Sequence, residues 1–103
     1  MMLVRTPIGE IVEVETLGDN TALTIDEIST LLEQESASVG LLTRRIAEYG
    51  VLISGLITKK ALYDNGDAEA IQSEIDQYEA ERTSAREQKT VTQSRVTLYN
   101  SYL

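Results

Sequence analysis

The sequence contains no cysteine, histidine, tryptophan or phenylalanine. Cysteine and histidine supply the nucleophilic thiol, the acid–base group that titrates near neutral pH, and the commonest zinc ligands. We therefore expect this chain alone to hold no metal and no cofactor, and not to be an enzyme. Without disulfides or a metal, a domain of 103 residues must gain stability elsewhere, and oligomerisation is a frequent route.

Long uncharged runs and positive charges are also scarce. The longest uncharged run covers residues 49–58, about half of the roughly 20 residues that a membrane-spanning helix needs. The start, "MMLVRTPIGE", has no basic segment followed by a long apolar one, so we expect no leader peptide. Nine basic residues against seventeen acidic ones give a net charge of -8, which disfavours nucleic acid and anionic lipid as partners.

A β-forming segment comes first. Residues 3–16, "LVRTPIGEIVEVET", are rich in β-branched residues and are interrupted by a Pro-Ile-Gly turn signal. This pattern predicts a hairpin that turns at residues 6–9, or a single strand, followed by a loop at 17–20. Both faces mix polar and apolar residues. We therefore expect residues 1–16, within a flap of residues 1–20, to attach to a larger protein partner rather than to build a core.

The first predicted helix has a well-marked start. Thr24 and Glu27 fit a capping box, and Leu23 with Ile28 fits a hydrophobic staple. From residue 25 to residue 63, core-forming positions follow one another in alternating steps of three and four, which is typical of a helix that packs in a coiled coil. The pattern predicts one helix over about 24–63, and a break near residues 36–40, at Gly40, is the alternative.

A second helix is predicted over about 68–101, after a turn at 64–67 in which Gly66 ends one helix and Asp67 caps the next. It carries its own apolar stripe from residue 71 to residue 103. Residues 21–103 are therefore expected to fold as an antiparallel helical hairpin, so the fold class is mainly α with a short β flap. The middle of the predicted seam between the two helices consists of Ile46, Tyr49, Ile53, Leu56, Ile75 and Tyr78.

Folding the second helix back on the first places opposite charges near each other. The expected neighbours are Lys59 and Lys60 with Glu69 and Glu74, Glu48 with Arg82 and Arg86, Arg44 and Arg45 with Glu87, and Glu33 and Glu35 with Arg95.

Two patterns could be mistaken for functional sites, one for a calcium site and one for a pair of catalytic carboxylates. The acidic turn "DNGD" suggests calcium, but the twelfth position of an EF-hand loop counted from Asp64 is Ile75 rather than a glutamate. Carboxylates two residues apart, such as Glu79 and Glu81, point in different directions from a helix. We therefore read the turn as a cap and the carboxylates as a solvated face.

The stretch "GVLISGLI", residues 50–57, is the most apolar part of the chain and is apolar on more than one side. A two-helix coil buries one stripe of each helix, so part of this surface needs another cover. We expect a homo-oligomer of three or more copies, and the alternative is that the flap folds over the patch. The predicted interface consists of Leu31, Leu41, Val51, Leu52, Ile57 and Leu62.

The short β segment, the acidic helical rod, the missing Cys and His and the Ser/Thr-rich tail "TVTQSRVTLYNSYL" together resemble small accessory proteins of tailed-bacteriophage virions. The resemblance implies a structural or assembly role in a capsid, neck or tail, with the virion as location; otherwise we expect the cytoplasm. Two other functions stay open: an adaptor or chaperone that presents an amphipathic groove, and an enzyme subunit whose site is shared with another chain.

Overall fold

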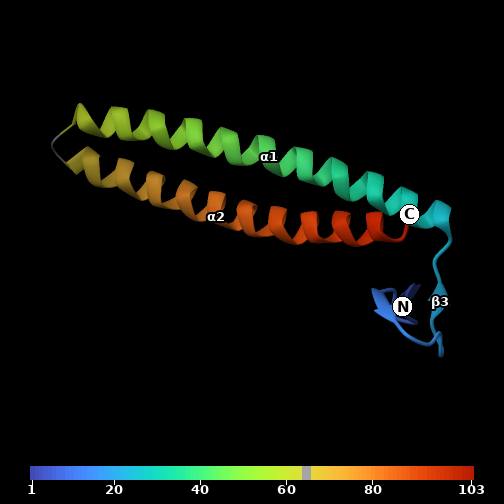
Figure 1. Ribbon diagram of the computed structural model, residues 1–103. Helices are drawn as coiled ribbons and strands as arrows, with labels where there is room; N and C mark the ends of the chain where they lie inside the picture. The colour runs from blue at the N-terminus through green and yellow to red at the C-terminus, as the bar shows by residue number, and fades with distance from the viewer. Residues whose placement is uncertain (64–65) are drawn as a thin grey trace.

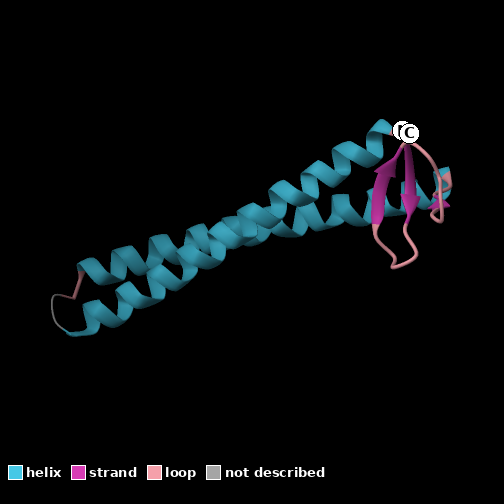
Figure 2. Ribbon diagram, turned by 90° about the horizontal axis from the view of Figure 1, so that it is seen from below, coloured by secondary structure: helices cyan, strands magenta, loops and turns pink. Residues whose placement is uncertain are grey.

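The computed structural model describes residues 1–63 and 66–103. It is a long antiparallel helical hairpin with a small antiparallel sheet at its open end, where both termini lie (Figure 1). The molecule is an extended rod of 64 × 22 × 16 Å, and the sheet lies against one end of it (Figure 2). The elements are β1 (Met2–Arg5), β2 (Ile11–Val14), β3 (Thr21–Ala22), α1 (Ile25–Ala61) and α2 (Gly66–Ser101).

Helix α1 starts with the predicted capping box. The Thr24 side chain accepts a hydrogen bond from the Glu27 backbone N–H (3.1 Å), and the Glu27 carboxylate accepts one from the Thr24 backbone N–H (3.2 Å). The helix then continues through Gly40, so the alternative with a break does not form. The turn predicted over residues 64–67 falls partly on Asp64 and Asn65, which lie outside the described residues, and α2 already begins at Gly66.

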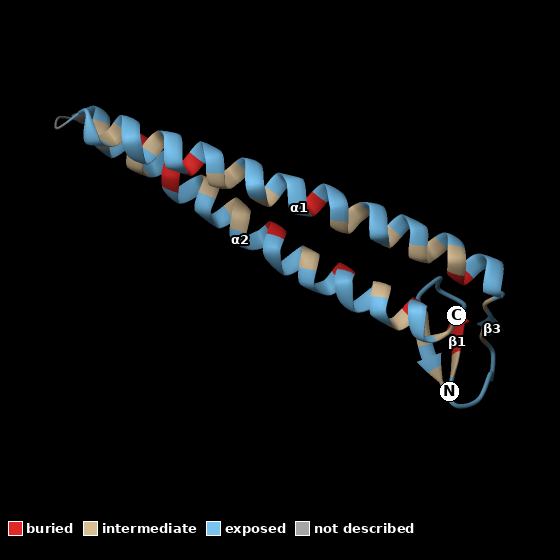
Figure 3. Cartoon of the chain, turned by 45° about the horizontal axis from the view of Figure 1, so that its top comes forward, coloured by how far each residue is buried: buried red, intermediate tan, exposed pale blue. Residues whose placement is uncertain are grey.

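The predicted seam between the helices is confirmed. The facing sides of α1 and α2 carry the buried positions (Figure 3). Near the closed end, Ile53, Ile71 and Ile75 form a buried cluster against which Leu56 and Tyr78 pack. The rings of Tyr49 and Tyr78 lie 6.1 Å apart between centroids, and Ile46 is half-buried. At the open end of the hairpin, Ile25 and Leu103 are exposed.

The sheet has the strand order β2-β1-β3, and both pairings are antiparallel. The β1–β2 hairpin turns where the sequence predicts: the Thr6 N–H donates to the Glu10 carbonyl (2.8 Å), and Gly9 takes a φ of 89° that favours glycine. Strand β3, which pairs Thr21 with Arg5, was not predicted. The sheet therefore extends past residue 20, which we had expected to be its boundary.

The sheet also belongs to the core, so the expectation that residues 1–16 form no core was wrong. Leu3 of β1 is buried in one cluster with Ile28 of α1 and Tyr99 of α2, and its neighbour Val4 has no exposed surface. The mixed alternation that suggested a solvated flap belongs mainly to β2. Strand β1 lies between β2 and β3, and its two central residues, Leu3 and Val4, are apolar.

Candidate interaction surface

Helix α1 and its C-cap carry a set of large apolar side chains that are exposed. Five of the six residues predicted as an interface are exposed, and the sixth, Leu31, packs against the cluster under the sheet. The sheet sits at the open end of the hairpin, so the alternative in which the flap covers this patch does not occur. We call the exposed set the outer face of α1: Leu41 (55% exposed), Val51 (74%), Leu52 (46%), Ile57 (54%) and Leu62 (78%).

A shallow hollow lies on this outer face. It has a volume of about 470 Å³ and is lined by Ala47, Glu48, Val51 and Leu52. Three of these four side chains are apolar, and all four come from two successive turns of one helix. A hollow lined mainly by apolar side chains can accept an apolar side chain from a neighbouring helix.

Two glycines, Gly50 and Gly55, lie in this part of α1. A Cβ added at Gly50 or at Gly55 would meet no heavy atom within 4 Å. Glycine in a helix interior costs about 0.5–1 kcal/mol relative to alanine. Nothing in the monomer requires the missing side chains.

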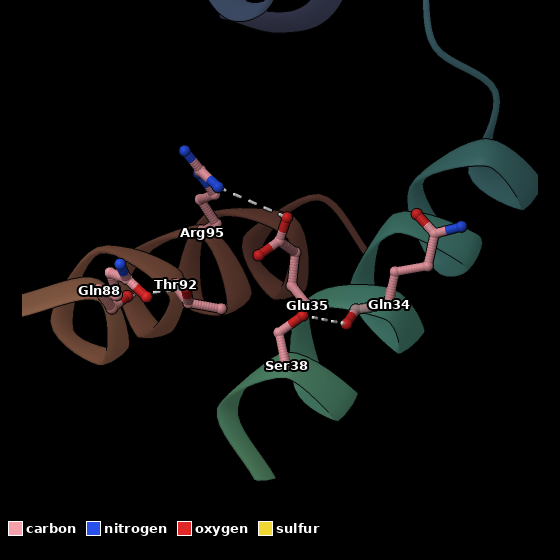
Figure 4. Close-up of polar contacts among 6 residues, drawn as sticks. All are labelled: Gln34, Glu35, Ser38, Gln88, Thr92 and Arg95. Atoms are coloured by element: carbon pink, nitrogen blue, oxygen red, sulfur yellow. Dashed lines mark hydrogen bonds and ion pairs between the residues drawn. The ribbon is translucent and has the colours of Figure 1, made fainter. Parts of the chain in front are cut away.

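A second depression runs along the hairpin between the helices. It is an open groove of about 580 Å³, and it forms because α2 contributes small or polar residues to the seam here. Thr92 is buried, and its hydroxyl donates to the Gln88 carbonyl of its own helix (2.8 Å) instead of reaching α1 (Figure 4). The lining is mixed in charge: Glu35, Ser38, Leu41, Leu42, Arg45, Ser84, Glu87, Gln88, Val91, Thr92 and Arg95.

The charge pairs predicted across the hairpin form at one place. The Arg95 guanidinium lies 3.7 Å from the Glu35 carboxylate, and Figure 4 shows the two side chains reaching toward each other from α2 and α1. Lys60 instead donates a hydrogen bond to the Gln72 side-chain oxygen.

The other predicted pairs do not come within ion-pair distance in the described part of the chain. Glu48, Arg44 and Arg86 therefore extend into solvent. The Nε of Arg82 is buried on the seam and has no hydrogen-bond partner among the residues that the structure describes.

Three tyrosines have altered titration, each for a different reason. Burial, followed by the nearby Glu81 carboxylate, raises the pKa of Tyr49. Burial, followed by the charge of Glu35, raises the pKa of Tyr99. The hydrogen bond to Glu13 is the main cause that raises the pKa of Tyr102. All three hydroxyls are therefore protonated donors at neutral pH, and none is an acid–base group in that range.

Sequence reasoning missed how the sheet is held. The Tyr102 hydroxyl donates a 2.7 Å hydrogen bond to the Glu13 carboxylate. Leu98 and Tyr102 pack against the cluster of Leu3, Ile28 and Tyr99. A signal was present, because Leu98 and Tyr102 are one turn apart beside Tyr99 at the same end of the hairpin as the start of α1.

Over the described ranges, no group of three or more acidic, histidine or cysteine side chains is placed to hold a metal ion. No helix in the same ranges is long and apolar enough to cross a bilayer. Comparison with protein-family models, with curated proteins and with solved structures finds no match to this chain.

Proposed function

We propose that this protein is a non-enzymatic structural protein that forms a homo-oligomer through the outer face of α1 and joins a larger assembly. The observation that carries the proposal is the exposure of Leu41, Val51, Leu52 and Ile57 on α1 and of Leu62 at its C-cap. Contiguous apolar patches on a soluble protein commonly mark protein interfaces.

The total surface area supports the same proposal. The chain exposes 7062 Å², whereas a compact monomer of 11.4 kDa is expected to expose about 5,800 Å². The excess of about 1,300 Å² is larger than the roughly 800 Å² that each partner buries in a standard interface. One copy of the rod therefore has enough surplus surface for one full interface and part of another, in keeping with the three or more copies that we propose.

The attachment to a larger partner is assigned to the sheet. Strand β1 is paired on both sides, so the backbone of β2 (Ile11–Val14) is the longer free edge. A strand of a partner protein can add to such an edge by main-chain hydrogen bonds. A virion component of a tailed bacteriophage is the assembly that we propose, on the resemblance described above.

The alternative function is an adaptor or chaperone that holds a client in a groove. The open groove of about 580 Å³ between the helices favours it. Its lining includes Glu35, Arg45, Glu87 and Arg95, so a client would have to match both signs of charge. An adaptor predicts a small oligomer that exchanges clients, whereas the structural role predicts a larger assembly of defined size.

The variant Leu52→Glu tests the proposed oligomer. A carboxylate buried at a subunit contact without a partner costs several kcal/mol, so we expect the assembly to dissociate while circular dichroism still shows two long helices. The matched control is Thr90→Glu, which adds the same charge at an exposed position of α2 and should leave the size unchanged. An unchanged oligomer for Leu52→Glu would exclude the outer face as the contact.

A further inference from the structure

We propose that the contact between copies is an antiparallel pairing of two α1 helices. A two-fold axis relates the two copies and passes between the helices at the level of Ile46. This inference rests on the proposed homo-oligomer and specifies its geometry. It uses one line of side chains on the side of α1 opposite the seam, which we call the outer stripe. The outer stripe consists of Ala37, Leu41, Arg44, Glu48, Val51 and Gly55, all of which are exposed.

The outer stripe follows the same spacing as a coiled-coil seam. Its members alternate steps of four and three residues, so they form one line along a helix of 3.6 residues per turn. Helix α1 therefore has two packing lines. The first is filled by α2, and the second has no partner among residues 1–63 and 66–103.

The outer stripe complements itself when a second copy runs in the opposite direction. Residues equally far from Ile46 on the two sides then face each other across the axis. Leu41 faces Val51 of the other copy, and Arg44 faces Glu48. Ala37 faces Gly55, and both are small enough for the helix backbones to approach closely. Each contact occurs twice, as a two-fold interface requires.

The charges disfavour the parallel arrangement. In a parallel pair in register, Arg44 would face Arg44 and Glu48 would face Glu48. In the antiparallel pair, both side chains gain an opposite charge. Neither Arg44 nor Glu48 has an ion-pair partner among the described residues of its own chain, although they are four residues apart on one helix. The antiparallel pair would supply two ion pairs between subunits.

The hollow on the outer face fits the same geometry. It is lined by Ala47, Glu48, Val51 and Leu52, and Leu41 of the opposite copy would face Val51, one of the lining residues. Leu41 is 55% exposed in the single chain, so it is free to insert. The side chain and its receiving hollow are thus provided by the same surface, which is the condition for a closed dimer.

A two-fold contact closes with two copies. Ile57 flanks the seam with α2, away from the outer stripe, and is exposed, so it is available for a further contact that joins such pairs into the larger assembly.

Charge variants test the pairing without altering its apolar part. Arg44→Glu places acid against acid in a homodimer, and Glu48→Arg places base against base, so each should weaken self-association about tenfold or more. Mixing the two variants restores opposite charges at both positions, so a one-to-one heterodimer should form with close to wild-type affinity. Circular dichroism of each variant shows whether the hairpin is intact. Unchanged self-association of either variant, or no heterodimer from folded variants, would overturn the pairing.

Cross-linking tests the direction of the helices. The chain has no natural cysteine, so single variants are clean probes. A mixture of Leu41→Cys and Val51→Cys should form a mixed disulfide under oxidation, because the two positions face each other. Disulfides between two copies of Leu41→Cys would show a parallel arrangement and overturn the inference. A wild-type chain that stays monomeric would contradict the proposed function itself. An oligomer whose assembly is unaffected by the charge variants, and in which the cysteine variants form no mixed disulfide, would contradict only this geometry.

Discussion

The hydroxyl of Tyr102, in the last turn of the chain, donates a 2.7 Å hydrogen bond to the carboxylate of Glu13 in β2. The two residues are 89 positions apart, and their contact closes the open end of the hairpin over Leu3, Ile28 and Tyr99. The sheet is therefore held where the chain begins and ends. Because it is held there, it leaves the outer face of α1 uncovered.

We expect Tyr102→Phe to loosen the sheet without unfolding the helices. The variant keeps the ring that packs against the cluster and removes only the hydroxyl that donates the hydrogen bond to Glu13. Hydrogen exchange of the β1 and β2 amides should become faster, while that of the seam near Ile53 stays the same. The control Tyr63→Phe removes a hydroxyl at the closed end of the hairpin. Equal exchange in wild type and Tyr102→Phe would show that the hydrogen bond does not hold the sheet.

Stability should fall as the pH rises above 10. The folded-state pKa values of Tyr49, Tyr99 and Tyr102 are raised above the ordinary 10.0, so the unfolded chain loses these protons first. The stabilisation is fully present below pH 10 and is lost as the pH rises through the raised values. Urea unfolding at increasing pH measures it, and Tyr99→Phe should flatten the curve. A free energy of unfolding that does not change above pH 10 would contradict the raised tyrosine pKa values.

Truncation of Leu3 tests whether the sheet belongs to the core. Leu3 is 3% exposed in the cluster with Ile28 and Tyr99, so Leu3→Ala should cost about 2–5 kcal/mol of unfolding free energy. Ile8, at the tip of the hairpin, is 81% exposed, and Ile8→Ala should change it by less than about 0.5 kcal/mol. Urea denaturation compares the two, and equal small effects would mean that the sheet is only loosely attached.

Two glycine variants should separate stability from assembly. Space for a Cβ is open at both Gly50 and Gly55, so each change to alanine should stabilise the helix by about 0.5–1 kcal/mol. Gly55 is in the outer stripe and Gly50 is not. Gly55→Ala should therefore also weaken self-association, while Gly50→Ala leaves it unchanged. Thermal unfolding and sedimentation measure the two effects, and identical association of both variants would argue against a close approach at Gly55.

Arg82 lowers the stability of the seam between the helices. Its Nε is buried without a hydrogen-bond partner in the described part of the chain, and an unsatisfied buried donor costs about 1–3 kcal/mol. Arg82→Met keeps the length of the side chain and removes the donor, so we expect the hairpin to gain about 1 kcal/mol. Arg86→Met, at an exposed position of the same helix, is the control. A loss of stability in Arg82→Met would indicate that the guanidinium has a favourable contact.

The hairpin could be predicted because its signals are local and repeat along the chain. The capping box at Thr24 and the regular spacing from Ile28 to Ile53 depend only on neighbours in sequence, and the structure confirms both. Gly40 was correctly read as part of a continuous helix, because the stripe keeps its phase across it.

The packing of the sheet could not be predicted in the same way. It depends on contacts between distant segments, such as Leu3 with Tyr99, and on the pairing of β1 with the two-residue strand β3. Leu31 was placed on the interface because its position on the helix is peripheral, yet the sheet packs beside it. The charge pairs mostly failed because exposed side chains gain too little from pairing to fix their positions.

The central claim is that the outer face of α1 is covered by another copy, and the mass of the wild-type protein in solution tests it most directly. Light scattering from micromolar to millimolar concentration should give a defined multiple of 11.4 kDa, and Leu52→Glu should return the mass to that of one chain. A wild-type mass of 11.4 kDa at the highest concentration would contradict the account.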